Sequence, residues 1–115
     1  MVNVIGLGYI GLPTALMLSA YGVEVIGTDY NEKLVDTLNE GKTTFSEDGL
    51  DKLFSSAVKA GICFTTQYQT TNIYIVSVPT PYDSVSKKVD ARYVKKAVEH
   101  ILDVCLDGTI IVIES

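Results

Sequence analysis

Short β-branched runs alternate with longer apolar stretches at helical spacing along this chain. Residues 2–5 form the first run, which Gly6 ends, and the stretch from Ile10 to Tyr21 then repeats its apolar residues at three- and four-residue intervals. Pro13 lies in the first turn of that predicted helix, where a missing N–H costs nothing, and Gly22 follows its end. The chain therefore opens with a strand, a glycine-rich turn and a helix.

The same order of strand and helix repeats through the rest of the sequence. Asn31, Ser46 and Asp90 are predicted to cap the later helices, since each stands just before a periodic apolar stretch. The run from Ile73 to Val78 is apolar almost throughout, as expected for a strand of a parallel sheet that helices cover on both faces. The later predicted strands cover residues 24–28, 62–65, 73–78 and 109–113.

This alternation predicts an α/β fold, a Rossmann-type doubly wound parallel sheet that makes residues 1–115 one domain. The sheet would end after about its fifth strand with no closing helix, so we expect the chain to be the front part of a longer protein. The connection between Thr66 and Ile73 is shorter than the dozen residues of a usual crossover. The placement of the third and fourth strands is therefore left open.

Composition narrows the function classes. The 115 residues carry a formal net charge of −5, with 9 Lys and Arg against 14 Asp and Glu, which disfavours binding to the phosphate backbone of nucleic acid. No apolar run approaches the ~18 residues of a membrane span, and no signal peptide is visible, so we expect a cytoplasmic protein without membrane contact. Cys63 and Cys105 are expected to be small buried residues, and His100 has no catalytic partner. No catalytic or metal-binding residue is predicted.

The glycines after the first strand fit the dinucleotide-binding pattern GxGxxG. Gly6 permits the tight turn, Gly8 leaves room for a pyrophosphate, and Gly11 lets the helix pack close to its strand. The helix N-terminus then presents free N–H groups and a positive dipole end to the phosphates. This arrangement binds two negative charges without a lysine, and the turn contains none.

An acidic residue at the end of the second strand supports the same interpretation. Asp29 follows Gly11 at about the 20-residue spacing at which an acid binds the adenosine ribose. Its carboxylate would repel a 2′-phosphate, and no arginine follows it directly, so NAD is predicted as the cofactor rather than NADP. Val78, Pro79 and Thr80 end a strand at the same edge of the sheet, where a ligand crossing the switch point would pass.

Several segments taken together resemble one family of dehydrogenases. The resemblance rests on Gly6-Leu-Gly-Tyr-Ile-Gly-Leu-Pro13, Gly27-Thr-Asp29, Glu47-Asp-Gly-Leu50, Val78-Pro-Thr-Pro81 and Glu114-Ser115. These segments are similar to the NAD-binding domain of the UDP-glucose/GDP-mannose dehydrogenase family, and the first is most similar to its UDP-N-acetyl-D-mannosamine dehydrogenase branch. The resemblance covers the whole chain.

The resemblance implies an oxidation of the C6 alcohol of a UDP-sugar to a uronate, for polysaccharide synthesis, with two NAD. It implies that Tyr9 and Ile10 contact the pyrophosphate through their backbone and that Thr80 contacts the nicotinamide half. The family's catalytic cysteine, lysine and asparagine belong to regions beyond this sequence. We therefore expect the chain alone to be inactive, the substrate to bind through the missing C-terminal part, and the parent protein to form a homo-oligomer.

Two other functions are compatible with the same glycine turn. A nucleotide-sensing Rossmann module without catalysis could bind NAD(H) or ATP there, and another β-hydroxyacid-type dehydrogenase could use the same cofactor. The Val78-Pro-Thr-Pro81 segment disfavours the latter by resemblance alone. The sequence following Ser115 would discriminate between them.

Overall fold

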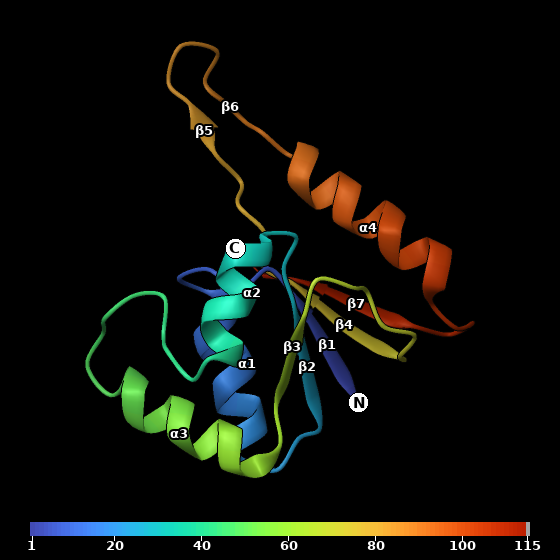
Figure 1. The fold of residues 1–115 in the computed structure, drawn as a ribbon. Helices are drawn as coiled ribbons and strands as arrows, with labels where there is room; N and C mark the ends of the chain where they lie inside the picture. The colour runs from blue at the N-terminus through green and yellow to red at the C-terminus, as the bar shows by residue number, and fades with distance from the viewer. Residues whose placement is uncertain (115) are drawn as a thin grey trace.

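A sheet of five parallel strands forms the centre of the computed structural model, which describes residues 1–114 (Figure 1). The strand order is β3-β2-β1-β4-β7, and every neighbouring pair is parallel. The predicted Rossmann-type parallel sheet is confirmed. The strands of this sheet are β1 (Val2–Ile5), β2 (Val25–Thr28), β3 (Cys63–Thr65), β4 (Ile73–Val76) and β7 (Ile110–Ile113).

Helices lie on both faces of the sheet, and each face has its own apolar core. Val2 and Val4 of β1 point into the larger core, which is shared with α1, α2 and α3. Ile5 points to the other face, where Tyr74 and Val76 of β4 pack against Ala97 and Ile101 of α4. The helices are α1 (Gly11–Ala20), α2 (Glu32–Asn39), α3 (Leu50–Ala60) and α4 (Arg92–Val104).

The connection from β3 to β4 crosses the sheet without a helix, which answers the question that its shortness raised. The buried side chain of Asn3 holds it: Asn3 Nδ2 donates to Thr28 Oγ1 at 2.8 Å, and Asn3 Oδ1 accepts from the Gln69 N–H at 3.1 Å. Thr28 Oγ1 in turn donates to the Gln67 carbonyl at 3.0 Å. Two buried polar side chains of the sheet therefore pair with backbone groups of the connection, which a helical crossover would pair within its own helix.

Of the three predicted helix caps, Asn31 is confirmed, Ser46 is wrong, and Asp90 lies one residue before the N-cap position of its helix. Asn31 caps α2 as expected, since its Oδ1 accepts from the Leu34 N–H at 3.2 Å. Instead of following Ser46, α3 begins after Gly49, which adopts a left-handed φ of 82°. Ala91 stands at the N-cap position of α4. The Asp90 side chain, one residue earlier, accepts from the Arg92 N–H at 3.0 Å and forms a salt bridge of 2.7 Å with the Arg92 side chain.

The burial predicted for the two cysteines is wrong for Cys63 and only partly met for Cys105. Cys63 is exposed because it begins the edge strand β3 and points away from the side that Phe64 occupies in the core. Cys105 is half-buried, where it follows α4 and contacts the smaller core. Val58 of α3 and Leu102 of α4, whose spacing fits the apolar stripes of their helices, are exposed as well.

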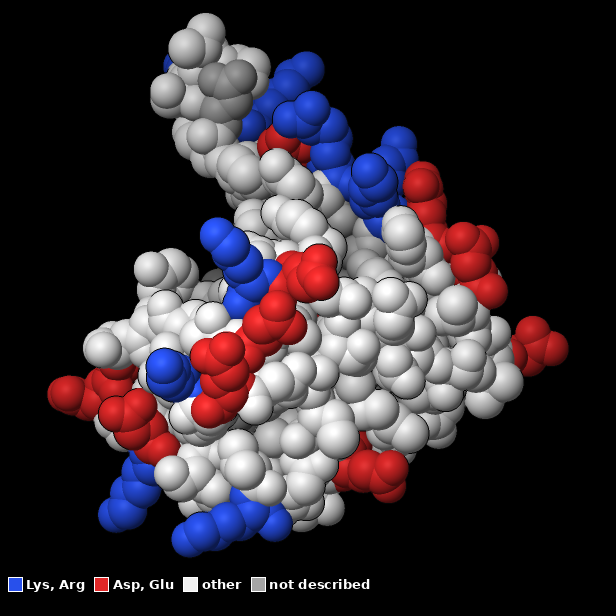
Figure 2. All heavy atoms as spheres, viewed as in Figure 1, with Lys and Arg blue, Asp and Glu red and all other residues white. Residues whose placement is uncertain are grey.

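A two-stranded antiparallel hairpin extends from the sheet between β4 and α4 and was not predicted (Figure 1). Its strands β5 (Tyr82–Asp83) and β6 (Lys88–Val89) are too short to show a periodic pattern. Figure 2 shows basic side chains gathered along this hairpin and α4. They are Lys87, Lys88, Arg92, Lys95 and Lys96, more than half of the 9 Lys and Arg of the sequence.

No helix among residues 1–114 combines the length and the apolar character that crossing a membrane requires.

Candidate dinucleotide-binding site

The glycine turn joins β1 to α1 at the carboxyl edge of the sheet. The absence of a side chain has a different physical consequence at each of its three glycines. Gly6 has a φ of 94°, and a Cβ there would lie 2.7 Å from the Ser77 carbonyl oxygen. A Cβ at Gly11 would lie 1.8 Å from the Gly6 carbonyl oxygen, so the helix could not start where it does. A Cβ at Gly8 would meet no protein atom within 4 Å. The protein itself needs Gly6 and Gly11, whereas Gly8 leaves space open toward the pocket.

The first turn of α1 offers an anion site. Ile10 stands at the N-cap position without a side-chain cap, and the first turn has no acidic residue. The Tyr9 ring packs against Phe45, with ring centroids 4.7 Å apart. The backbone of this turn is therefore left to face the pocket, where free N–H groups and the helix dipole favour a phosphate.

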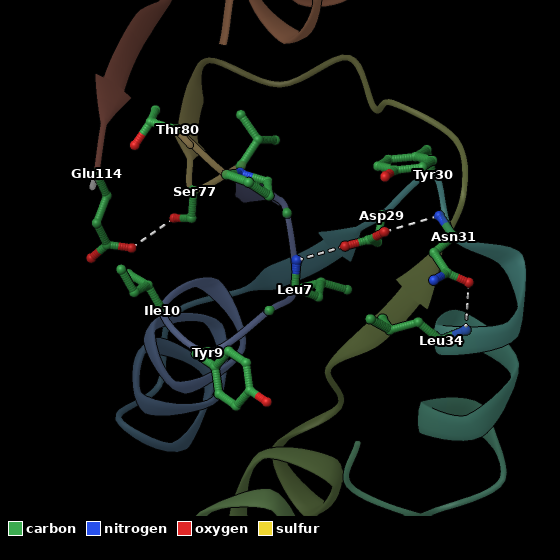
Figure 3. Close-up of a pocket in the computed structure, with 14 residues that line it drawn as sticks. Leu7, Tyr9, Ile10, Asp29, Tyr30, Asn31, Leu34, Ser77, Thr80 and Glu114 are labelled. Carbon is green, nitrogen blue, oxygen red and sulfur yellow. Dashed lines mark hydrogen bonds between the residues drawn. The ribbon is translucent and has the colours of Figure 1, made fainter. Parts of the chain in front are cut away.

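Asp29 follows β2 and is fixed by two backbone donors. The Leu7 N–H donates to Asp29 Oδ2 at 2.9 Å, and the Asn31 N–H donates to Asp29 Oδ1 at 2.9 Å (Figure 3). A carboxylate has about four lone-pair sites, so both oxygens can still accept hydroxyl groups. The carboxylate thus links the glycine turn to β2 as well as lining the pocket, a second role that the sequence did not indicate.

A pocket of about 380 Å³ lies above the carboxyl ends of β1, β2, β4 and β7. This volume is within the usual range of small-molecule sites. Eight of the predicted site residues line it, and the ninth, Gly11, is buried at the start of α1. The predicted residues in its lining are Gly6, Gly8, Tyr9, Ile10, Asp29, Val78, Pro79 and Thr80, and the lining residues not predicted are Leu7, Tyr30, Asn31, Leu34, Ser77 and Glu114.

Glu114 and Ser77 mark the end of the pocket away from Asp29 (Figure 3). Ser77 Oγ donates to Glu114 Oε1 at 2.7 Å, and Thr14 Oγ1 donates to Glu114 Oε2 at 2.9 Å. The rule that ligands bind at the carboxyl ends of parallel strands could have indicated Glu114, since it directly follows the last strand. Ser115 lies outside the described residues.

Tyr68 lies beside a smaller cavity that adjoins Asp29 and Pro79. Burial and, to a smaller extent, the negative charge of Asp29 raise the pKa of Tyr68 above its usual 10.0. Its ring stacks on that of His100, with centroids 5.1 Å apart. The only histidine of the sequence therefore has an aromatic neighbour and no place in the pocket lining.

The two cysteines and the histidine lie outside the lining of the larger pocket. No cluster of His, Cys, Asp and Glu within residues 1–114 has the arrangement of a metal site. The arrangement suits binding and orienting a ligand with two phosphates and a ribose.

Known proteins are similar to this chain over nearly its whole length. The UDP-N-acetyl-D-mannosamine dehydrogenase of Methanococcus aeolicus is 44% identical over 115 residues, covering 97% of this chain and 26% of that protein. The NDP-N-acetyl-D-galactosaminuronic acid dehydrogenase of Ralstonia nicotianae is 40% identical over 115 residues, covering 99% of this chain and 27% of that protein. The chain thus spans about a quarter of the length of these relatives.

A solved structure and a family model agree with these relatives. The UDP-N-acetyl-mannosamine dehydrogenase Cap5O from Staphylococcus aureus superposes with a TM-score of 0.93 at 34% identity, covering 99% of this chain and 28% of that one. The model of the UDP-glucose/GDP-mannose dehydrogenase family, NAD binding domain, matches residues 1–115. The resemblance predicted from the motifs is therefore confirmed, and this chain belongs to the UDP-glucose/GDP-mannose dehydrogenase family, whose NAD-binding domain it matches from end to end.

Proposed function

We propose that this chain binds NAD as the N-terminal cofactor domain of a longer nucleotide-sugar 6-dehydrogenase. The observation that carries the proposal is the contrast within the glycine turn: two glycines are required by protein contacts, whereas the third is required by none. A residue kept free of a side chain beside an uncapped helix N-terminus fits the close approach of a pyrophosphate. The residues present therefore fit the cofactor.

In this proposal the dinucleotide lies across the pocket in one direction. Asp29 would accept the hydroxyl groups of the adenosine ribose, and the backbone of Gly8, Tyr9 and Ile10 would face the phosphates. Val78, Pro79 and Thr80 would then lie beside the nicotinamide half, at the end where β4 leaves the sheet. When bound, NAD supplies the hydride acceptor of the reaction, and this chain contributes binding and orientation.

The relatives favour a UDP-sugar substrate for the whole protein, with UDP-N-acetyl-D-mannosamine as the specific proposal. The C6 alcohol of the sugar would be oxidised to the uronate, and two NAD⁺ would be reduced to NADH. The chain spans about a quarter of these relatives, so the nucleophile and the sugar site are assigned to the remaining part. The 115-residue chain alone is then expected to bind NAD weakly and to form no NADH from the sugar nucleotide.

Titration of the chain with NAD⁺, followed by backbone NMR shifts, tests cofactor binding. We expect shifts at the glycine turn and at Asp29, and Asp29→Asn should weaken binding about 10- to 100-fold through the loss of charge-assisted hydrogen bonds. Glu32→Gln is the matched control, because it makes the same change on an exposed residue outside the pocket lining. The absence of any shift at millimolar NAD⁺, or equal loss in both variants, would contradict the proposal.

A further inference from the structure

The pocket carries its acidic groups at opposite ends. Among the described lining residues, Asp29 stands at the end of β2 and Glu114 at the end of β7 (Figure 3). The glycine turn, where the phosphates are proposed to bind, lies between them. Under the proposed function, Asp29 binds the adenosine ribose, whereas no group of the ligand has yet been assigned to Glu114.

Within residues 1–114, the side chain of Glu114 is held in place by neutral donors. Thr14 Oγ1 lies 3.0 Å from Glu114 Oε1 and 2.9 Å from Oε2, and Ser77 Oγ lies 2.7 Å from Oε1. The Glu114 N–H also donates to the Val76 carbonyl at 2.8 Å, which fixes the backbone that bears the carboxylate. Three elements, α1, β4 and β7, therefore hold one half-buried carboxylate at this end of the pocket.

No cation of the protein compensates this charge within residues 1–114. Glu114 takes part in no salt bridge there, and the lining includes no lysine, arginine or histidine. A half-buried charge without a counter-ion favours a ligand group of opposite charge, since the attraction is screened less than it would be in bulk water.

Resting on the proposed function, we propose that Glu114 makes the site select the oxidised dinucleotide over the reduced one. The nicotinamide half would lie at the end formed by Ser77, Thr80 and Glu114, because the adenosine half is directed to Asp29. The oxidised nicotinamide ring carries a positive charge, and the reduced ring is neutral. The Glu114 carboxylate attracts the first and gains nothing from the second, so reduction of the ring in place weakens its binding.

This selectivity suits a protein proposed to use two NAD for each substrate. The reduced cofactor has to leave before the second oxidised one binds. A carboxylate that favours only the oxidised ring assists that exchange without moving any part of the chain.

The test compares three ligands on the 115-residue chain by NMR titration: NAD⁺, NADH and ADP-ribose, which lacks the nicotinamide. Glu114→Gln retains a hydrogen-bond acceptor and removes the charge. We expect this variant to bind NAD⁺ about 3- to 10-fold more weakly, while its affinities for NADH and ADP-ribose change less than about twofold. Glu24→Gln is the matched control, because Glu24 is exposed and precedes β2 at the opposite edge of the sheet.

Thr14→Val separates the charge of Glu114 from its structural contacts. This variant removes one donor and keeps the carboxylate, so the preference for NAD⁺ over NADH should persist even where the fold is less stable. Equal loss of all three ligands in Glu114→Gln, or an unchanged ratio of NAD⁺ to NADH affinity, would overturn the inference and leave the proposed function standing. Failure of the unaltered chain to bind even ADP-ribose would overturn the proposed function and this inference together.

Discussion

Replacing Gly8 with alanine separates what the fold needs from what the ligand needs. The new Cβ meets no protein atom within 4 Å, and the backbone at Gly8 is not in the left-handed region. The folded state therefore accepts the substitution without strain. The methyl group occupies the open side of the turn, where the pyrophosphate is proposed to approach the backbone.

The expected effects on stability and on binding have opposite signs. Where the native backbone is compatible, Gly→Ala stabilises a protein by about 0.4–1 kcal/mol, because the unfolded chain loses freedom. Binding should lose at least one charge-assisted hydrogen bond to phosphate, about 1.5–3 kcal/mol, which corresponds to roughly 10- to 150-fold in affinity. The variant should thus be as stable as the unaltered chain or slightly more so, and a poor NAD binder.

Gly22→Ala is the matched control, since it makes the same chemical change in open space at a φ of 96°. It should lower the free energy of unfolding by about 1–3 kcal/mol and leave NAD affinity unchanged at temperatures where the chain is folded. Denaturant unfolding and NMR titration measure both quantities on both variants. Undiminished NAD binding by Gly8→Ala would refute the assignment of the open glycine to the phosphates.

Three further outcomes follow from particular contacts. NADP⁺ should bind at least about 10-fold more weakly than NAD⁺ in the same NMR titration, because its 2′-phosphate meets the Asp29 carboxylate and the lining offers no cation; comparable affinities would contradict this role of Asp29. Because the pKa of Tyr68 is raised in the folded state, its contribution to stability is present below pH 10.0 and lost as the pH rises through the raised value, so unfolding measured across that range should be less pH-dependent in Tyr68→Phe. Asn3→Leu should lower the free energy of unfolding by about 2–4 kcal/mol, since Thr28 and Gln69 lose buried partners; a neutral effect would show that the connection does not depend on them.

The sequence was sufficient to predict the parallel α/β sheet, although not the positions of β3 and β4 within it, because the signals for individual strands and helices are local. The spacing of hydrophobic residues predicts β1 and α1, and the turn between them needs a backbone conformation that glycine adopts most easily. The acidic residue after β2 could be assigned for a similar reason, since the fold fixes its distance from the turn. These signals depend on neighbours within one βα unit.

One error is local: Ser46 has the chemistry of a cap, yet α3 begins later, after Gly49, which adopts a left-handed conformation. Other features that the sequence did not indicate depend on residues distant in the chain. The path of the connection before β4 depends on Asn3, more than sixty positions earlier. Hydrogen bonds from Thr14 and Ser77 hold Glu114 at the pocket, and the hydrophobic pattern of the sequence does not indicate such contacts.

The two motifs that identified this site prove to be one structure. Gly6 needs to be glycine because the Ser77 carbonyl lies against it, and Ser77 directly precedes the Val78-Pro-Thr-Pro81 segment. Leu7, in the same turn, donates to Asp29, so the turn is braced from both sides before any ligand arrives. A site organised in this way should keep its selectivity even where its affinity is low. Contacts supplied by the rest of the longer protein would strengthen the binding of NAD⁺ and of NADP⁺ alike, and they cancel from the ratio of the two affinities. The preference set by Asp29 should therefore be measurable in the 115-residue chain and agree with that of the whole protein; a preference that appeared only in the whole protein would place selection outside this domain.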